Sequence, residues 1–137
     1  MSDDKDKYQK LRILVIEDES YTRLMIVGLL RQIGFNLIGE AAEGEAGFKE
    51  TVRTRPQVVL CDVHMAPMDG LDYLGKLRGF ANQAIAATPV VFLTADKQQE
   101  TVLSAKQLKV DGYLVKPVSL QVLKQRLDGL LKFHNLL

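Results

Sequence analysis

The chain of 137 residues is 47% hydrophobic and 26% charged, which is the length and composition of one globular domain. It carries 18 Lys and Arg residues against 17 Asp and Glu residues, and this net charge of +1 indicates neither a nucleic-acid nor a membrane partner. Its single cysteine, Cys61, rules out an intrachain disulfide. Residues 1–10 (MSDDKDKYQK) lack the apolar core of a signal peptide, and no apolar stretch approaches the ~18 residues of a spanning helix. We therefore expect a cytoplasmic protein that begins with a flexible polar tail over residues 1–10.

Short apolar runs alternate with segments of helical spacing after this tail. The runs are typical of strands buried on both faces and lie at residues 11–16, 35–38, 58–60, 90–93 and 113–115. Helices are predicted over residues 20–33, 43–54, 71–80, 98–108 and 118–133. Ser20 is the predicted N-cap of the first helix, and Gly34 lies just past its end. Five such alternations favour one α/β domain over residues 11–134, with an open, doubly wound parallel sheet and five flanking helices.

Polar residues follow four of the five predicted strands. They are Glu17-Asp18-Glu19 after the first, Asp62 after the third, Thr94-Ala95-Asp96 after the fourth and Lys116-Pro117 after the fifth. In an open parallel sheet, ligands bind at the carboxyl ends of the strands, so we expect these side chains to gather at one edge. Taken alone, Glu17 and Asp18 would also fit the first turn of a helix, and Thr94 a local bond to the backbone.

This combination of side chains is suited to phosphoryl chemistry. Carboxylates of Glu17, Asp18 and Asp62 that converge in a cleft repel one another and require a cation, and oxygen-only ligands favour Mg²⁺. The Lys116 ammonium can pair with a carboxylate or a phosphate, and the Thr94 hydroxyl can donate to a phosphate oxygen. The residues thus predict an aspartate that accepts a phosphoryl group beside a metal.

The chain resembles the receiver domains of two-component response regulators, most closely the stand-alone type typified by the chemotaxis protein CheY. The resemblance covers about residues 12–131 and is carried by VIEDE, CDVHMAPMDGL, FLTAD and GYLVKP, in that order. It implies a sheet of strand order 2-1-3-4-5, as in flavodoxin-like folds. It also implies a protein that is not an enzyme but a phosphorylation-dependent switch.

The resemblance assigns a role to each matching residue. Asp62 is expected to be the phosphoacceptor, and Glu17, Asp18 and Asp62 to bind Mg²⁺ together with the backbone carbonyl of His64. Thr94 and Ala95 are expected to contact the phosphate with Lys116, and Tyr113 to be an aromatic switch, although core packing is the other interpretation of a tyrosine in a strand. Pro117 is expected to follow a cis bond, and His64 and Asp96 to tune dephosphorylation.

Two positions depart from the family pattern. Pro67 lies one place later than in the usual MPxMDG motif of the loop after Asp62. Lys109 stands where many receivers have Gly before the fifth strand. If Lys109 ends its helix in the left-handed conformation, it carries a steric cost that Gly would avoid.

The expected partners are a histidine kinase or a histidine phosphotransfer protein as donor, and a target at the surface of the fourth helix, fifth strand and fifth helix. Control of a motor or kinase in chemotaxis is one such output. An apolar patch at Leu24 and Val27 on the first helix is a candidate docking site for the donor; scattered exposed apolar residues are the alternative. We expect a monomer, with a phosphorylation-dependent dimer as the alternative.

A flavodoxin-like or phosphatase-like enzyme on the same topology is the competing hypothesis. A flavodoxin needs a phosphate loop rich in Gly, Ser and Thr after the first strand. A phosphatase of the haloacid dehalogenase type needs a nucleophilic aspartate there in a DxD pattern. Glu17-Asp18-Glu19 provides neither, which favours the switch.

Overall fold

Five parallel strands form one sheet in the order β2-β1-β3-β4-β5, as predicted. The computed structural model describes residues 3–137. The strands are β1 (Arg12–Ile16), β2 (Leu37–Ala41), β3 (Val58–Cys61), β4 (Val90–Thr94) and β5 (Gly112–Val115). The central strands β3 and β4 are buried along their whole length, because helices cover both faces of the sheet.

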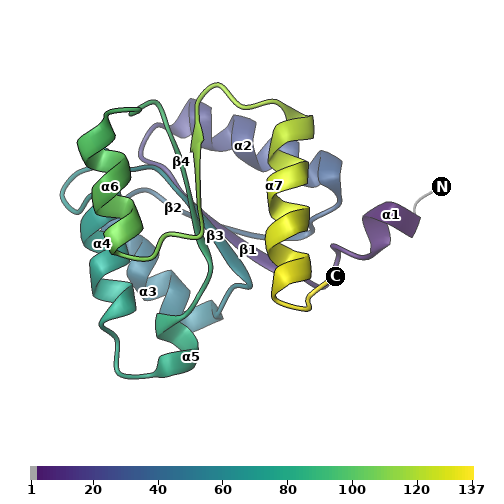
Figure 1. Cartoon of the computed structure of the whole chain (residues 1–137). Coiled ribbons are helices and arrows are strands. Elements are labelled where there is room, and N and C mark those ends of the chain that lie inside the picture. The colour runs from purple at the N-terminus through teal and green to yellow at the C-terminus, as the bar shows by residue number, and fades with distance from the viewer. Residues whose placement is uncertain (1–2) are drawn as a thin grey trace.

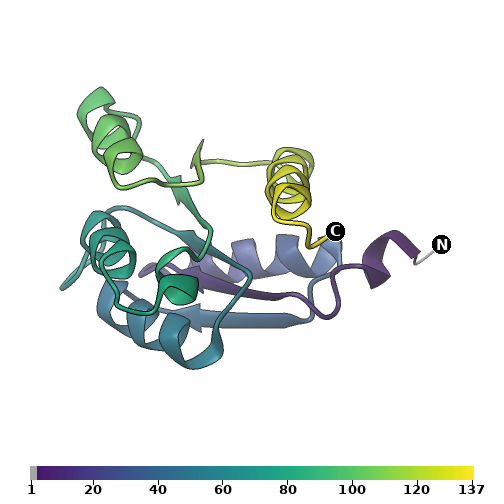
Figure 2. The same cartoon turned by 60° about the horizontal axis from the view of Figure 1, so that its bottom comes forward.

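Helices pack on both sides of this sheet, with α2 and α7 on one face and α3, α4 and α6 on the other (Figure 1, Figure 2). Their bounds are α2 (Ser20–Ile33), α3 (Gly44–Thr54), α4 (Gly70–Arg78), α6 (Gln99–Gln107) and α7 (Leu120–Phe133). The sequence did not predict the two short helices α1 (Asp3–Asp6) and α5 (Gln83–Ala86). Among the described residues, no helix is both long and apolar enough to cross a membrane.

The start of α2 and both ends of β2 differ from the prediction. The N-cap of α2 is Glu19 rather than Ser20, because the Glu19 carboxylate accepts the backbone N–H of Thr22 at 2.6 Å. β2 spans Leu37–Ala41 rather than residues 35–38, since Phe35 enters the core before the strand begins and the pairing with β1 continues to Ala41. Elsewhere the predicted elements agree with the structure to within one or two residues.

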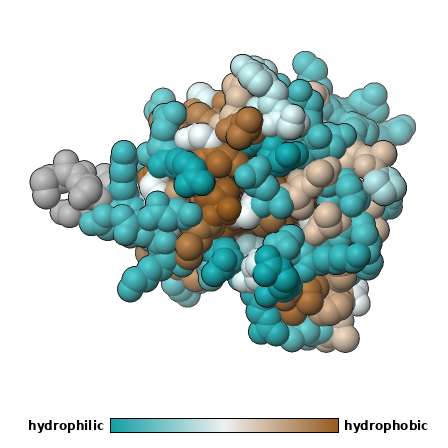
Figure 3. Space-filling view, turned by 180° about the vertical axis from the view of Figure 1, so that it is seen from behind, coloured by the Kyte–Doolittle hydropathy of each residue, from teal (hydrophilic) through white to brown (hydrophobic). Residues whose placement is uncertain are grey.

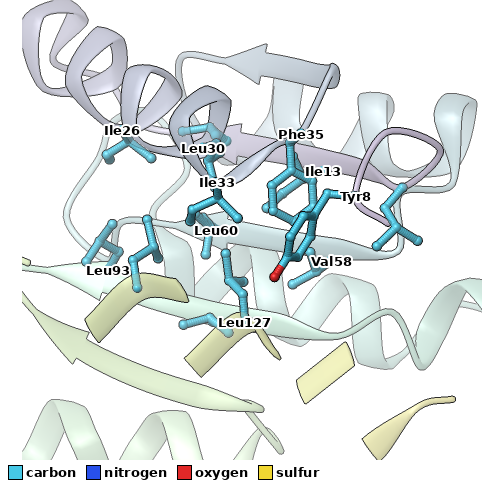
Figure 4. Packing of buried hydrophobic residues seen from close by; sticks show 14 of the residues in the cluster. Tyr8, Ile13, Ile26, Leu30, Ile33, Phe35, Val58, Leu60, Leu93 and Leu127 are labelled. Atoms are coloured by element: carbon cyan, nitrogen blue, oxygen red, sulfur yellow. The ribbon is translucent and has the colours of Figure 1, made fainter. Parts of the chain in front are cut away.

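The larger core cluster lies between the sheet and the α2–α7 layer and includes Tyr8, from the segment predicted to be a polar tail (Figure 4). Tyr8 is fully buried; its ring centroid lies 5.1 Å from that of Phe35, and its hydroxyl donates to Asp128 of α7 at 2.5 Å. Residues 3–10 therefore differ from the expected tail, because an aromatic ring among polar residues gains more from burial than from exposure. Residues 1 and 2 of that predicted tail lie outside the described residues.

Lys109, just after α6, takes the left-handed conformation considered in the sequence analysis, with a φ of 60°. The Arg78 guanidinium donates to the Lys109 carbonyl at 3.0 Å and to the Asp111 carboxylate at 2.9 Å. These bonds hold the turn that leads into β5, so surrounding contacts offset the strain of a non-glycine residue there.

Candidate functional site

Three carboxylates meet at the carboxyl edge of the sheet, where the sequence predicted them. Glu17 and Asp18 follow β1 and Asp62 follows β3, and one oxygen from each lies within 4.8 Å of the others. The order of strands explains this meeting, because β1 and β3 are neighbours in the sheet although more than forty residues separate them. Glu17 is buried and Asp18 is exposed, so the cluster opens to solvent on one side.

Lys116 joins this cluster from the end of β5. Its ammonium donates to Oε1 of Glu17 at 2.5 Å and to Oδ2 of Asp62 at 3.1 Å. The Glu17 side chain is only 2% exposed, and this burial raises its pKa even though Lys116 acts in the opposite direction. Burial disfavours the charge of Lys116, but the two carboxylates outweigh it and raise the pKa of its ammonium.

The backbone fixes the position of Asp62. Its N–H donates to the Ile16 carbonyl at 3.0 Å, and its Oδ1 accepts the N–H of Val63 at 2.6 Å. The start of α4 packs so closely here that a Cβ on Gly70 would lie 2.2 Å from the Asp62 carbonyl oxygen. Gly70 was not predicted to be part of the site, although its place after Asp69 in the CDVHMAPMDGL motif was a signal for it.

Arg23 is a second residue that the sequence analysis missed. Its guanidinium donates to the Glu17 carbonyl at 2.7 Å and pairs with Glu40 at 3.0 Å. It thereby holds the chain just where β1 ends and the acidic pair begins. One arginine within an amphipathic helix gives no sequence signal of such a contact.

The donor set of this site fits a magnesium ion. Glu17, Asp18 and Asp62 offer only oxygen, and three carboxylates this close favour a divalent cation between them. The Lys116 ammonium neutralises part of their charge but reaches only Glu17 and Asp62. The arrangement can therefore hold a hard cation on its open side, next to Asp18.

Thr94 and Tyr113 lie near this cluster, and the hydroxyl groups of both bond to the backbone of Asp96. Thr94 is buried at the end of β4, and its Oγ1 accepts the N–H of Asp96 at 3.2 Å, which is the local bond considered as the alternative. Tyr113 is half-buried, its ring lies edge-on to Phe92, and its hydroxyl donates to the Asp96 carbonyl at 2.6 Å. Ala95, the residue after Thr94, is exposed.

Comparison with known proteins assigns this arrangement to a family. The family described as "Response regulator receiver domain" matches residues 13–128. The chain belongs to this family. It is therefore a signalling module of two-component systems and not a classical enzyme, and receivers interact with kinases and with target proteins.

Named relatives of this receiver include chemotaxis proteins. CheY-3 of Vibrio cholerae is 33% identical over 120 residues, which is 88% of this chain and 91% of the relative. CheY of Pseudomonas aeruginosa is 31% identical over 125 residues, which is 91% of this chain and 99% of the relative.

Solved structures agree in fold. Vibrio cholerae CheY4 has a TM-score of 0.79 at 25% identity and covers 88% of this chain and 98% of its own. A CheX-CheY-BeF3-Mg complex from Borrelia burgdorferi has a TM-score of 0.81 at 22% identity, covers 90% and 91% of the two chains, and shows the shared fold.

His64 and Asp96, predicted to tune the receiver, are in direct contact. His64 lies in the loop between β3 and α4, and its Nε2 meets Oδ2 of Asp96. Hydrogen bonds to the Asp96 carboxylate, first from the N–H of Gln98 and then from His64, hold its pKa below the usual range. A role of the His64 carbonyl as a metal ligand stays a prediction.

The Lys116-Pro117 bond is cis, as predicted for this receiver. The loop after Asp62 contains a second cis bond, Ala66-Pro67, at the proline that lies one place later than in the family pattern. This second cis bond was not predicted.

Of the two residues predicted to form a docking patch on α2, only one is exposed. Leu24 is 66% exposed, but Val27 is only 6% exposed and belongs to the core. The helix turns Val27 toward the sheet together with Ile26, so it cannot contact a partner. The exposed apolar neighbours of Leu24 are instead Tyr21 and Met25.

Proposed function

We propose that Asp62 accepts a phosphoryl group from a histidine kinase or a histidine phosphotransfer protein, and that this event switches the protein-binding surface of the receiver. The observation that carries the proposal is the position of the Asp62 carboxylate, within 4.8 Å of Glu17 and Asp18 and paired with Lys116 at 3.1 Å. This site can place a nucleophilic carboxylate, a cation and an ammonium group around one phosphoryl group.

Each residue of the site has a separate part in this reaction. An Asp62 oxygen forms the new P–O bond as the bond to the donor breaks, and the Lys116 ammonium, which pairs with Asp62 beforehand, then pairs with the phosphate. Glu17, Asp18 and Asp62 would hold Mg²⁺, which supplies positive charge to offset that of the phosphoryl oxygens when bound. The Thr94 hydroxyl turns to the phosphate, with Ala95 moving beside it, and Tyr113 turns inward as the readout.

The proposed output surface is formed by α6, β5 and α7. Leu103, Val115 and Val122 are exposed apolar residues on these three elements. In support of this, β5 lies between α6 and α7 in the fold (Figure 2). A target protein would bind there in one state and leave in the other, and the CheY relatives make chemotaxis the first output to test.

We further propose that the phosphodonor docks on α2 through Tyr21, Leu24 and Met25. Met25 also lines a groove of about 330 Å³ between α2 and the segment after β5. Its lining is mostly apolar and consists of Thr22, Met25, Ile26, Leu29, Leu93, Lys116, Pro117 and Val118. Lys116 lines this groove and also pairs with Asp62, so a donor bound in the groove would reach Asp62.

Intact mass after incubation with phosphoramidate and Mg²⁺ tests the proposal. We expect one phosphoryl group per chain, lost again with time, and none in Asp62→Asn. Asp72→Asn is the matched control, because Asp72 lies in the first turn of α4 and outside the acidic cluster. Steady hydrolysis of ordinary phosphomonoesters that Asp62→Asn leaves unchanged would instead support the competing enzyme hypothesis.

A further inference from the structure

Asp18 differs from the other two carboxylates of the acidic cluster in how it is held. Lys116 pairs with Glu17 and with Asp62, and backbone N–H groups donate to both of these carboxylates. The Asp18 side chain is exposed, and within residues 3–137 it takes part in no salt bridge. The position of its carboxylate therefore depends on the backbone of the bend between β1 and α2.

Arg23 of α2 fixes the peptide group that joins Glu17 to Asp18. Its Nη1 donates to the Glu17 carbonyl oxygen at 2.7 Å, and the Glu17 N–H donates to the Ala41 carbonyl at 3.0 Å. The Nε of Arg23 donates to the Glu40 carboxylate of β2 at 3.0 Å. A planar guanidinium that bonds two partners through different nitrogens has a defined direction. The peptide before Asp18 is thus held from α2 and β2 together.

We propose that Arg23 is a positioning residue for the cation site, because its hold on this peptide directs the Asp18 carboxylate toward Glu17 and Asp62. The inference rests on the proposed function, since it concerns the Mg²⁺ that phosphorylation of Asp62 would use. Arg23 does not contact the cation in this role. It acts through Asp18, whose carboxylate oxygen lies within 4.8 Å of one oxygen from each of the other two.

The Arg23 guanidinium affects the affinity for a cation in two ways that differ in sign. Its positive charge lowers the affinity, although the paired Glu40 carboxylate offsets that charge. Its hold on the backbone raises the affinity, since a carboxylate that is already in place loses less freedom when the cation binds. Outer partners that orient a metal ligand contribute roughly 10- to 100-fold to metal affinity. We therefore expect the effect of the hold to exceed that of the charge.

Isothermal titration calorimetry of Mg²⁺ into the full unphosphorylated chain tests this role. Arg23→Met keeps an apolar stem but removes both the charge and the donors. Arg23→Lys keeps the charge, but one ammonium group cannot replace the fork that bonds Glu17 and Glu40. Arg31→Met is the matched control, because it removes the same charge from the last turn of the same helix.

Two further measurements on the same variants separate positioning from damage to the fold. Amide hydrogen exchange over residues 17–19 without Mg²⁺ reports the hold on the backbone independently of the cation. Urea unfolding shows which variants are folded under the conditions of the titration. If Arg23→Met is unfolded there, Arg23→Lys decides, because charge alone predicts wild-type affinity for it and positioning predicts a loss.

The expected result is Mg²⁺ binding about tenfold weaker in Arg23→Met, with faster exchange over residues 17–19. Arg23→Lys should lie between this variant and wild type, and Arg31→Met should equal wild type. Unchanged or tighter Mg²⁺ binding in folded Arg23→Met overturns the role, because only the charge would then matter. An equal loss of affinity in Arg31→Met also overturns it.

The proposed function fails by a different measurement, the intact mass after incubation with phosphoramidate and Mg²⁺. A chain that binds Mg²⁺ with the expected dependence on Arg23 but takes up no phosphate contradicts the proposed function and supports the role of Arg23. A wild-type chain that binds no Mg²⁺ overturns the role of Arg23, and its intact mass still decides whether Asp62 accepts a phosphoryl group.

Discussion

Lys116 shows how one residue balances part of the charge of the acidic cluster. It is the ammonium group that pairs with both Glu17 and Asp62, and Glu17 is almost fully buried. A buried carboxylate is stable only when it is paired or protonated, so Lys116 contributes to keeping the site ionised. The same positive charge also competes with any cation that the carboxylates bind.

Lys116→Met should therefore increase the affinity for Mg²⁺ by roughly tenfold, because a positive charge in direct contact with two of the ligand carboxylates is removed. Isothermal titration calorimetry of the unphosphorylated protein measures this directly. Lys76→Met is the control, since Lys76 pairs with Glu45 on the surface of α3 and α4. Weaker Mg²⁺ binding in Lys116→Met would show that the lysine organises the carboxylates rather than competing with the ion.

At the scale of elements, the segment before β1 stabilises the packing of α7. The Tyr8 ring lies against Phe35, and its hydroxyl bonds Asp128, which Lys124 also contacts at 2.9 Å. α1 and the end of the chain lie near each other in both ribbon views (Figure 1, Figure 2). Gly34 permits this approach, because a Cβ there would lie 2.7 Å from the Lys5 carbonyl oxygen.

Tyr8→Ala should lower the free energy of unfolding by about 3 kcal/mol, because it leaves a cavity where a fully buried ring was. Tyr8→Phe keeps the ring and should cost about 1 kcal/mol through the lost bond to Asp128. Urea unfolding followed by circular dichroism measures both. Tyr21→Ala, at an exposed position of α2, should change the stability by less than about 0.5 kcal/mol. Equal losses in Tyr8→Ala and Tyr21→Ala would contradict the packing of the Tyr8 segment.

The whole molecule presents apolar surface on more than one side. The proposed output surface lies over α6, β5 and α7, whereas the groove beside α2 opens next to Lys116. Viewed from behind, hydrophobic residues also gather in a central patch bordered by hydrophilic ones (Figure 3). Patches bordered by polar residues are typical of interaction sites, so separate surfaces are available for a donor and for a target.

Charged residues at Leu24 and Met25 should therefore separate docking from chemistry. In the double variant Leu24→Glu/Met25→Glu, we expect phosphotransfer from a donor protein that phosphorylates the wild-type chain to slow by at least tenfold, since apolar contacts at the interface are lost. Phosphorylation by phosphoramidate should be unchanged. Leu103→Glu, on the exposed side of α6, is the control and should affect neither rate. Equal slowing with both donors would indicate damage to the site instead of to docking.

The alternation of apolar runs and helical spacing was sufficient to predict the five strands, because strands buried on both faces must be apolar throughout. The acidic pair, Asp62, Thr94 and Lys116 were also predictable, since parallel strands place the residues that follow them at one edge. The cis bond before Pro117 was anticipated from the resemblance to receivers, and the left-handed Lys109 was raised as a condition by comparison with the same family pattern.

Tertiary structure alone decided the contacts that depend on distant partners. Tyr8 lies 120 residues before Asp128 in the chain, so no local pattern could indicate that it enters the core. The rotation of α2 about its axis buries Val27 and exposes Tyr21 and Met25. A shift of one residue in the phase of the helix would change which of these side chains face the sheet. The sequence by itself determined which residues form the acidic cluster with Lys116, because the positions that follow the strands can be read from the chain. Packing between separate elements decided how His64 closes on Asp96, since side chains from different loops meet only in the folded chain.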